Sequence, residues 1–372
     1  MANTKVTSRV LADDAVNISN INTTASDGVG TSPSADGQAL VAKALSSGYR
    51  LDWATISSGA SAIDGLSDGT TQGTRNTGLG ANALDDGSLS GTQNTAVGES
   101  AGTAVTSGTN VNAFGYSALA SNTTGGDNCA FGTEALGALT TGSRNVAIGK
   151  EALLRATTSN ENTAVGNVSM VDLTTGTANI AMGHASLYEL TTGSYNTALG
   201  TNCMQNETTG GYNTAVGYQA LTTQNGGGNN VAIGRWSGKA VTTGVDNTFV
   251  GLNSALNTTT GNYNTALGSQ AMNNNTTGSE NVAIGRNALL ANTTANNNVA
   301  VGVECLDGNT TGTQNTAIGK AALGSNTTGN YNTAVGAYAI DAGTHSNNTA
   351  VGWGAGTSIT TSDNTAVGKG AL

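Results

Sequence analysis

The chain has 372 residues, and its composition is unlike that of an ordinary globular protein of this length. It contains 54 Gly and 1 Pro, only 3 Phe and 3 Trp, and 10% charged residues. A compact core needs more large apolar side chains, whereas small residues suit a narrow core built turn after turn. The net charge of −10, with scattered Lys and Arg, disfavours nucleic acid and anionic membranes as partners. The sequence also lacks an apolar run long enough to span a bilayer.

Residues 1–70 lack the repeat that fills the rest of the chain. We expect residues 1–35 to form an attachment arm and linker, with the only proline of the chain in the linker. Residues 36–70 are expected to form a small β-hairpin module, because apolar residues alternate around a turn at Ser46–Gly48. The N-terminus has no apolar segment typical of a signal peptide, so we expect synthesis in a cytoplasm.

Residues 71–372 consist of 18 repeats, each closed by the Gly of an Asn-Thr-Ala-Val-Gly block. From Gly98 to Gly336 every spacing between these glycines is 17, and the outer spacings are 18, 16 and 16. Such a constant period predicts an all-β fold, a parallel β-solenoid with 17-residue turns. At about 4.8 Å per stacked strand, the solenoid would be roughly 85 Å long.

Each column of the aligned repeats has a predicted place. The residue before the Gly is always apolar and is expected to fill the interior. The residue before that is Ala in 16 of 18 turns, except at Gly78 and Phe249, and is expected to allow close approach of another chain. A second apolar column, four residues after the Gly, predicts a second strand across the core. The Gly of a recurring Thr-Thr-Gly is expected to supply the positive φ of another corner.

An Asn ladder is the predicted turn device. Asn stands four residues before the Gly in 17 of 18 turns, with Val111 as the departure. Asn tolerates left-handed backbone angles and can hydrogen-bond to nearby backbone groups, so stacked Asn residues are expected to form the turns. The ladder comprises Asn76, Asn94, Asn128, Asn145, Asn162, Asn179, Asn196, Asn213, Asn230, Asn247, Asn264, Asn281, Asn298, Asn315, Asn332, Asn348 and Asn364.

The repeated block x-Asn-Thr-Ala-Val-Gly-x-x-Ala-Leu, with Asn-Val-Ala-Ile-Gly variants at 145–149, 230–234 and 281–285, resembles the head repeat of YadA-like trimeric adhesins. Similar arrays occur in phage tail fibres. The resemblance covers about Asn76–Leu372 and implies a left-handed β-roll with three chains around a threefold axis. Because the period is longer here and the Asn sits one place closer to the Gly, a larger roll or a three-sided helix stays open. The N-terminal module resembles the tail-attachment modules of phage fibres.

Catalytic or metal chemistry is not expected, and we predict neither an enzyme nor a cofactor. Only His184 and His345 are present, far apart in the sequence. The acidic residues beside the Gly alternate with Lys and Arg, which is typical of a solvated face rather than of a glycosidase carboxylate pair. The three Cys residues are expected to be small buried apolar groups. A column of Tyr residues before the Asn either stacks on sugars of a cell-surface glycan or packs between chains and over the corner.

Three functions remain. The first is a structural phage tail-fibre shaft, a rigid homotrimeric spacer of the virion that is made in the host cytoplasm and acts outside the cell. It would bind a tail or baseplate adaptor through its N-terminal region and reach a host receptor, glycans included, directly or through a distal tip. The chain stops within a turn, which predicts a cap from another protein or a removed C-terminal domain. The alternatives are a bacterial surface adhesin or filament subunit and, as a lesser one, an ice-binding solenoid.

Overall fold

A computed structural model describes residues 38–45, 48–55, 69–70, 75–341 and 343–372. The chain divides into two units, residues 1–64 and 65–372. In the first unit, β1 (Gln38–Leu45) pairs antiparallel with β2 (Gly48–Thr55), where the alternation predicts a hairpin. The predicted arm and linker over residues 1–35, and the first two residues of the predicted turn, lie outside the described residues.

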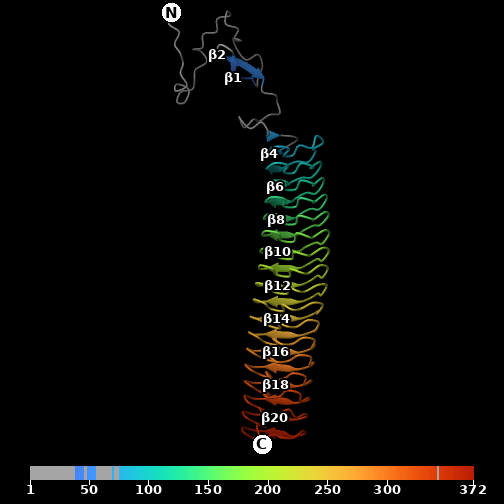
Figure 1. Ribbon diagram of the computed structural model, residues 1–372, viewed down its shortest axis with the longest axis vertical. Coiled ribbons are helices and arrows are strands. Elements are labelled where there is room, and N and C mark those ends of the chain that lie inside the picture. The colour runs from blue at the N-terminus through green and yellow to red at the C-terminus, as the bar shows by residue number, and fades with distance from the viewer. Residues whose placement is uncertain (1–37, 46–47, 56–68, 71–74, 342) are drawn as a thin grey trace, which may run out of the picture. The chain divides into compact units, whose positions relative to one another are not determined.

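The second unit is a β-solenoid (Figure 1). Eighteen short parallel strands stack in one sheet, and each pairs in register with the strand one turn away. β3 (Gly69–Thr70) pairs antiparallel with β4 at one end, β21 pairs only with β20 at the other, and the sheet is therefore an open ladder. The predicted all-β solenoid of 17-residue parallel turns is confirmed, and the described residues contain no helix.

The strand bounds follow the repeat, and each strand ends at the residue before a corner Gly. The parallel strands are β4 (Thr77–Leu79), β5 (Thr95–Val97), β6 (Asn112–Phe114), β7 (Cys129–Phe131), β8 (Val146–Ile148), β9 (Thr163–Val165), β10 (Ile180–Met182), β11 (Thr197–Leu199), β12 (Thr214–Val216), β13 (Val231–Ile233), β14 (Thr248–Val250), β15 (Thr265–Leu267), β16 (Val282–Ile284), β17 (Val299–Val301), β18 (Thr316–Ile318), β19 (Thr333–Val335), β20 (Thr349–Val351) and β21 (Thr365–Val367).

The middle residue of each parallel strand points into the core. Its Ala side chains are at most 2% exposed, whereas the first and third residues of the strands are half-buried or exposed. Ile148, for example, is 42% exposed and Met182 46%. The expectation that the large column fills the interior and that Ala faces another chain is therefore wrong. The reason is that the core is narrow, because the Leu side chains of the second apolar column are fully buried in it and leave room mainly for small residues on this wall.

The one bulky exception on this wall shows how thin the core is. Phe249, the middle residue of β14, is fully buried. In the turn before it, the column that usually holds Leu has Gly238, and in the turn after it the same column has Ala255. A Cβ added to Gly238 would lie 2.9 Å from the Phe249 ring. A large side chain on the sheet wall thus requires small residues on the opposite wall.

The second apolar column forms that opposite wall, but not as a strand. Its side chains are buried, among them Leu136 and Leu153, both with 0% exposure. Both residues adopt φ 53, in the left-handed region. Such a backbone costs a non-Gly residue about 1–2 kcal/mol. Stacking offsets this cost, because the Leu136 N–H donates to the Ala152 carbonyl of the next turn at 3.0 Å. The predicted second strand is therefore replaced by a turn with buried apolar side chains.

The glycines serve two different purposes. The corner Gly149 adopts φ 132, and a Cβ there would also overlap the backbone of Gly166 in the next turn. Gly142 of the Thr-Thr-Gly segment lacks a positive φ, so the role predicted for it is wrong. Its smallness instead allows close approach, because an added Cβ would meet the Ser159 carbonyl. Ser159 and Ala295 occupy this column in two turns, so the approach tolerates a small side chain there.

Candidate functional site

The outward face of the sheet is a candidate interaction surface. We call the first and third residues of β4–β21 the outer strip. None of these residues is charged, although neighbouring columns carry Glu, Lys and Arg. The third residues are Leu79, Val97, Phe114, Phe131, Ile148, Val165, Met182, Leu199, Val216, Ile233, Val250, Leu267, Ile284, Val301, Ile318, Val335, Val351 and Val367.

Apolar exposure continues along the whole length of the outer strip. Phe131 is 41% exposed near one end, Ile233 40% in the middle and Val351 40% near the other end. The Phe114 and Phe131 rings stack with centroids 4.5 Å apart and planes 3° from parallel. An exposed apolar column that repeats at every level of the sheet marks a candidate interaction surface.

The Asn ladder lies inside the solenoid, next to the sheet. Asn179 donates from Nδ2 to the Gly193 carbonyl at 2.9 Å, and its Oδ1 accepts from the Asn196 N–H at 2.9 Å. The same pair of bonds recurs along most of the column, as at Asn264 and Asn315. The left-handed residue is the one before the Asn, such as Tyr195 with φ 61. The ladder therefore joins neighbouring turns through hydrogen bonds, and the Asn backbone is not the left-handed element.

A second buried polar column was not found by sequence reasoning. It lies seven residues after the corner Gly, where Asn292 donates from Nδ2 to Asn275 Oδ1 at 2.8 Å, and Asn309 to Asn292 Oδ1 at 3.2 Å. Glu207 occupies the same column with 0% exposure, and its Oε1 accepts from the Gly210 N–H at 2.6 Å and the Gly226 N–H at 2.9 Å. The run of Asn at a fixed spacing of 17 was the available signal.

The chemistry-bearing side chains do not gather into a reactive site. Cys203 and Cys305 are buried, and burial raises the pKa of each thiol to about 12. Cys129 is half-buried on the outer strip, where burial also raises its pKa. Within the described residues, no three His, Cys, Asp or Glu side chains come close enough together to hold a metal ion. The described part of the chain also contains no helix with the length and hydropathy needed to cross a bilayer.

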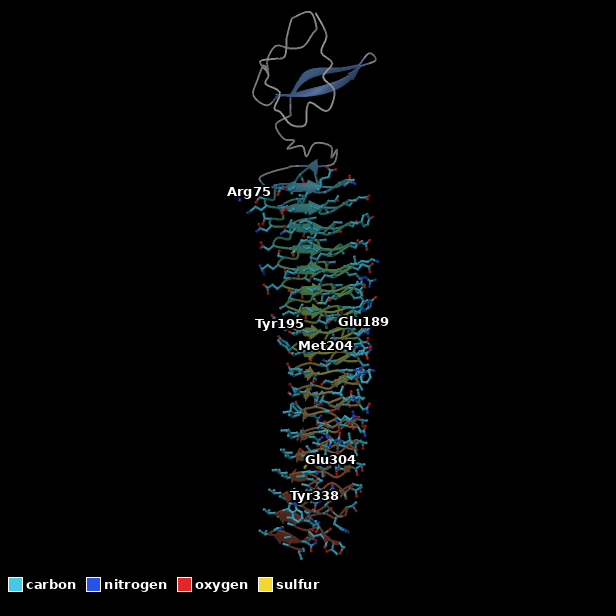
Figure 2. The ribbon with its side chains drawn as sticks, turned by 90° about the vertical axis from the view of Figure 1, so that its left-hand side faces the viewer. Arg75, Glu189, Tyr195, Met204, Glu304 and Tyr338 are labelled. Atoms are coloured by element: carbon cyan, nitrogen blue, oxygen red, sulfur yellow. The ribbon has the colours of Figure 1, made fainter. Side chains whose placement is uncertain are left out.

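The Tyr column lies on one exposed edge of the solenoid. Tyr195, Tyr212, Tyr263 and Tyr331 are 53–65% exposed. The Tyr195 and Tyr212 rings stack with centroids 5.0 Å apart. In Figure 2, Tyr195 and Glu189 lie at opposite edges of the rod. Both roles predicted for this column remain predictions.

A comparison with known protein families, curated proteins and solved structures found no match to this chain. The outer strip and the ladders are therefore the basis for a functional interpretation.

Proposed function

We propose that the chain is the shaft of a homotrimeric fibre, a rigid spacer of the phage tail-fibre kind that serves host adhesion. The observation that carries this proposal is the uncharged, half-exposed outer strip along all 18 parallel strands. A surface of this kind on a rod fits lateral association with identical rods, because every level of the rod offers an uncharged first residue and an apolar third residue. The number three rests on the resemblance of the repeat to trimeric adhesin heads.

The energetics of the outer strip favour association. Burying the exposed part of one Ile, Leu or Val contributes about 1 kcal/mol. Eighteen third-position side chains therefore outweigh an association cost of about 4–15 kcal/mol. The interface would run along the Val, Ile and Leu column, not along the Ala column that the sequence suggests. Attachment to a tail or baseplate adaptor is proposed for the N-terminal region.

A bacterial surface adhesin or filament subunit would use the same strip and remains the alternative. Ice binding requires a flat array of Thr side chains on one face. The first Thr of the Thr-Thr pair instead directs its hydroxyl along the ladder, as Thr140 Oγ1 does to the Thr157 carbonyl at 3.0 Å. Its replacement by Asn225 in one turn breaks the Thr column. This arrangement disfavours the Thr-Thr column as an ice-binding surface.

Electron microscopy of the purified full-length chain tests the proposal. We expect slender rods whose end-on class averages show three equivalent lobes around an axis. Single-lobed rods would contradict the homotrimer. Thermal hysteresis measured on the same sample would identify ice binding, and we expect none.

A further inference from the structure

Eight of the nine Lys and Arg residues within residues 75–372 fall into two groups that differ in their partners, and Arg75 belongs to neither. Arg144, Lys150, Arg155 and Arg286 form ion pairs with carboxylates at 2.6–2.9 Å. A second group of four cations lies against aromatic rings, and the described residues hold no ion pair for any of them: Arg235, Lys239, Lys320 and Lys369. The described partner of each of these four cations is thus an aromatic ring and not a carboxylate.

Four consecutive turns form what we call the C-terminal cluster, consisting of Lys320, Tyr338, Trp353 and Lys369. Lys320 Nζ lies 5.4 Å from the Tyr338 ring centroid, and Lys369 Nζ lies 5.5 Å from that of Trp353. The two rings meet edge to face, with centroids 6.4 Å apart and planes at 76°. Trp353 is 55% exposed, so ring surface is open to a ligand. Figure 2 shows Tyr338 on the C-terminal part of the rod.

A similar arrangement, the middle cluster, lies seven turns away on the same corner of the rod. There Arg235 Cζ lies 3.8 Å from the Trp236 ring centroid and Lys239 Nζ lies 5.3 Å from it. Trp236 Nε1 donates to Gln219 Oε1 at 2.9 Å, and the adjacent Tyr218 is 45% exposed. At about 4.8 Å per turn, the two clusters are about 34 Å apart, so one polymer could contact both.

The solenoid backbone holds the cluster residues at fixed spacings. The Tyr338 N–H donates to the Lys320 carbonyl at 2.9 Å, and the Gly370 N–H donates to the Trp353 carbonyl at 2.9 Å. The residues therefore stand one turn apart before any ligand arrives. A preformed arrangement lowers the entropic cost of binding.

We propose that the C-terminal cluster binds acidic polysaccharides. Trp353 stacks on the apolar face of a sugar ring, and Lys320 and Lys369 donate charge-assisted hydrogen bonds to sugar carboxylates on either side. The proposal rests on the proposed fibre function, because it names the class of receptor that such a fibre would meet at a cell surface.

The charge of the chain favours this ligand over two others. A nucleic acid is held by many phosphate contacts, whereas a chain of net charge −10 with two lysines at the cluster repels a dense polyanion. An uncharged sugar offers no carboxylate to either ammonium group. A polysaccharide with one carboxylate every one or two sugars fits the alternation of cation and ring.

The test measures binding of the full-length chain to immobilised hyaluronan and alginate, with dextran as the uncharged control and oligothymidine as the nucleic-acid control. Two variants probe the cluster, namely Trp353→Ala and the double variant Lys320→Gln/Lys369→Gln. Tyr116→Ala is the matched control, because it removes a ring that is 50% exposed and lies, like Trp353, directly after a corner Gly, in a turn far from both clusters. Solution mass and circular dichroism of each variant establish assembly and folding separately.

We expect binding to at least one acidic polysaccharide, weakened about tenfold or more in both cluster variants and unchanged in Tyr116→Ala. Affinity should also fall as salt is raised, since the ion pairs are exposed. The proposal is overturned if wild type binds neither acidic polysaccharide, if oligothymidine binds as well as they do, or if Tyr116→Ala loses as much affinity as Trp353→Ala. An assembled trimer that does not bind would leave the fibre proposal intact, whereas a monomer that binds would contradict only the fibre proposal.

Discussion

Replacing Asn179 by Ala should strongly destabilise the middle of the solenoid. The substitution removes the bond from Asn179 Nδ2 to the Gly193 carbonyl and the bond that Asn179 Oδ1 accepts from the Asn196 N–H, both 2.9 Å long. Gly193 and Asn196 are buried, so neither backbone group can turn to water. A buried group left without its partner costs about 1–3 kcal/mol. The two groups together predict a loss of about 2–6 kcal/mol.

Asn167→Ala is the control. Asn167 lies between the same two corner glycines as Asn179, its side chain is exposed, and it makes no hydrogen bond within the described residues. Urea unfolding of both variants at one protein concentration gives the free-energy change, which should stay within about 0.5 kcal/mol for the control. Hydrogen exchange should locate the loss near residues 179–196, since repeat proteins open locally. Equal urea midpoints for the two variants would refute the reasoning about the ladder.

Three further predictions concern single positions. Gly149→Ala, at φ 132, should cost about 3 kcal/mol or more in urea unfolding, whereas Gly87→Ala, with nothing within 4 Å of an added Cβ, should be neutral. Val168→Asn should raise stability by about 1 kcal/mol, because a β-branched residue adopts φ 49 there. The thiols of Cys203 and Cys305 should resist maleimide at pH 8 until urea is added. The pKa of each folded thiol is about 12, above the usual 9.0, so the thiols of the unfolded chain ionise first as the pH rises. The free energy of unfolding should therefore be unaffected by these thiols below pH 9 and should fall from pH 9 towards pH 12.

The solenoid was predictable from the sequence because the period itself is the structural signal. In a solenoid, the Gly, Asn and Ala of each turn stack on the equivalent residues of the next turn. A constant spacing of 17 between these residues therefore predicts the stacking. Loss of register by one residue would move buried Ala to the surface. The burial of the second apolar column was predictable for the same reason.

The sequence analysis predicted the wrong face of the sheet as the one that points into the core. It took the larger side chains to be the buried ones. In a three-residue strand, alternation says only that neighbours point to opposite sides. The better signal was constancy: the inward column admits only Ala, Gly78 and Phe249, whereas the outward column varies among Val, Ile, Leu, Met and Phe. The pairing of Phe249 with Gly238 was also visible in the sequence, and it identifies the crowded side.

The left-handed turn at the Leu column and the aromatic–cation clusters were beyond the sequence reasoning for a different reason. A Leu with φ 53 contradicts its intrinsic preference, and only stacking on the next turn sustains it. Trp353 and Lys369 are 16 residues apart, so their proximity requires the folded period as well as the residue types.

The central claim is that identical chains associate through the outer strip, and the mass in solution tests it most directly. Sedimentation equilibrium of wild type is compared with the variant Ile148→Lys/Ile233→Lys/Ile318→Lys, whose three residues are 40–42% exposed on the strip. We expect wild type to have the mass of three 36.6 kDa chains and the variant to have that of one folded chain. A wild type of single-chain mass, or a variant that keeps three chains, would contradict the account.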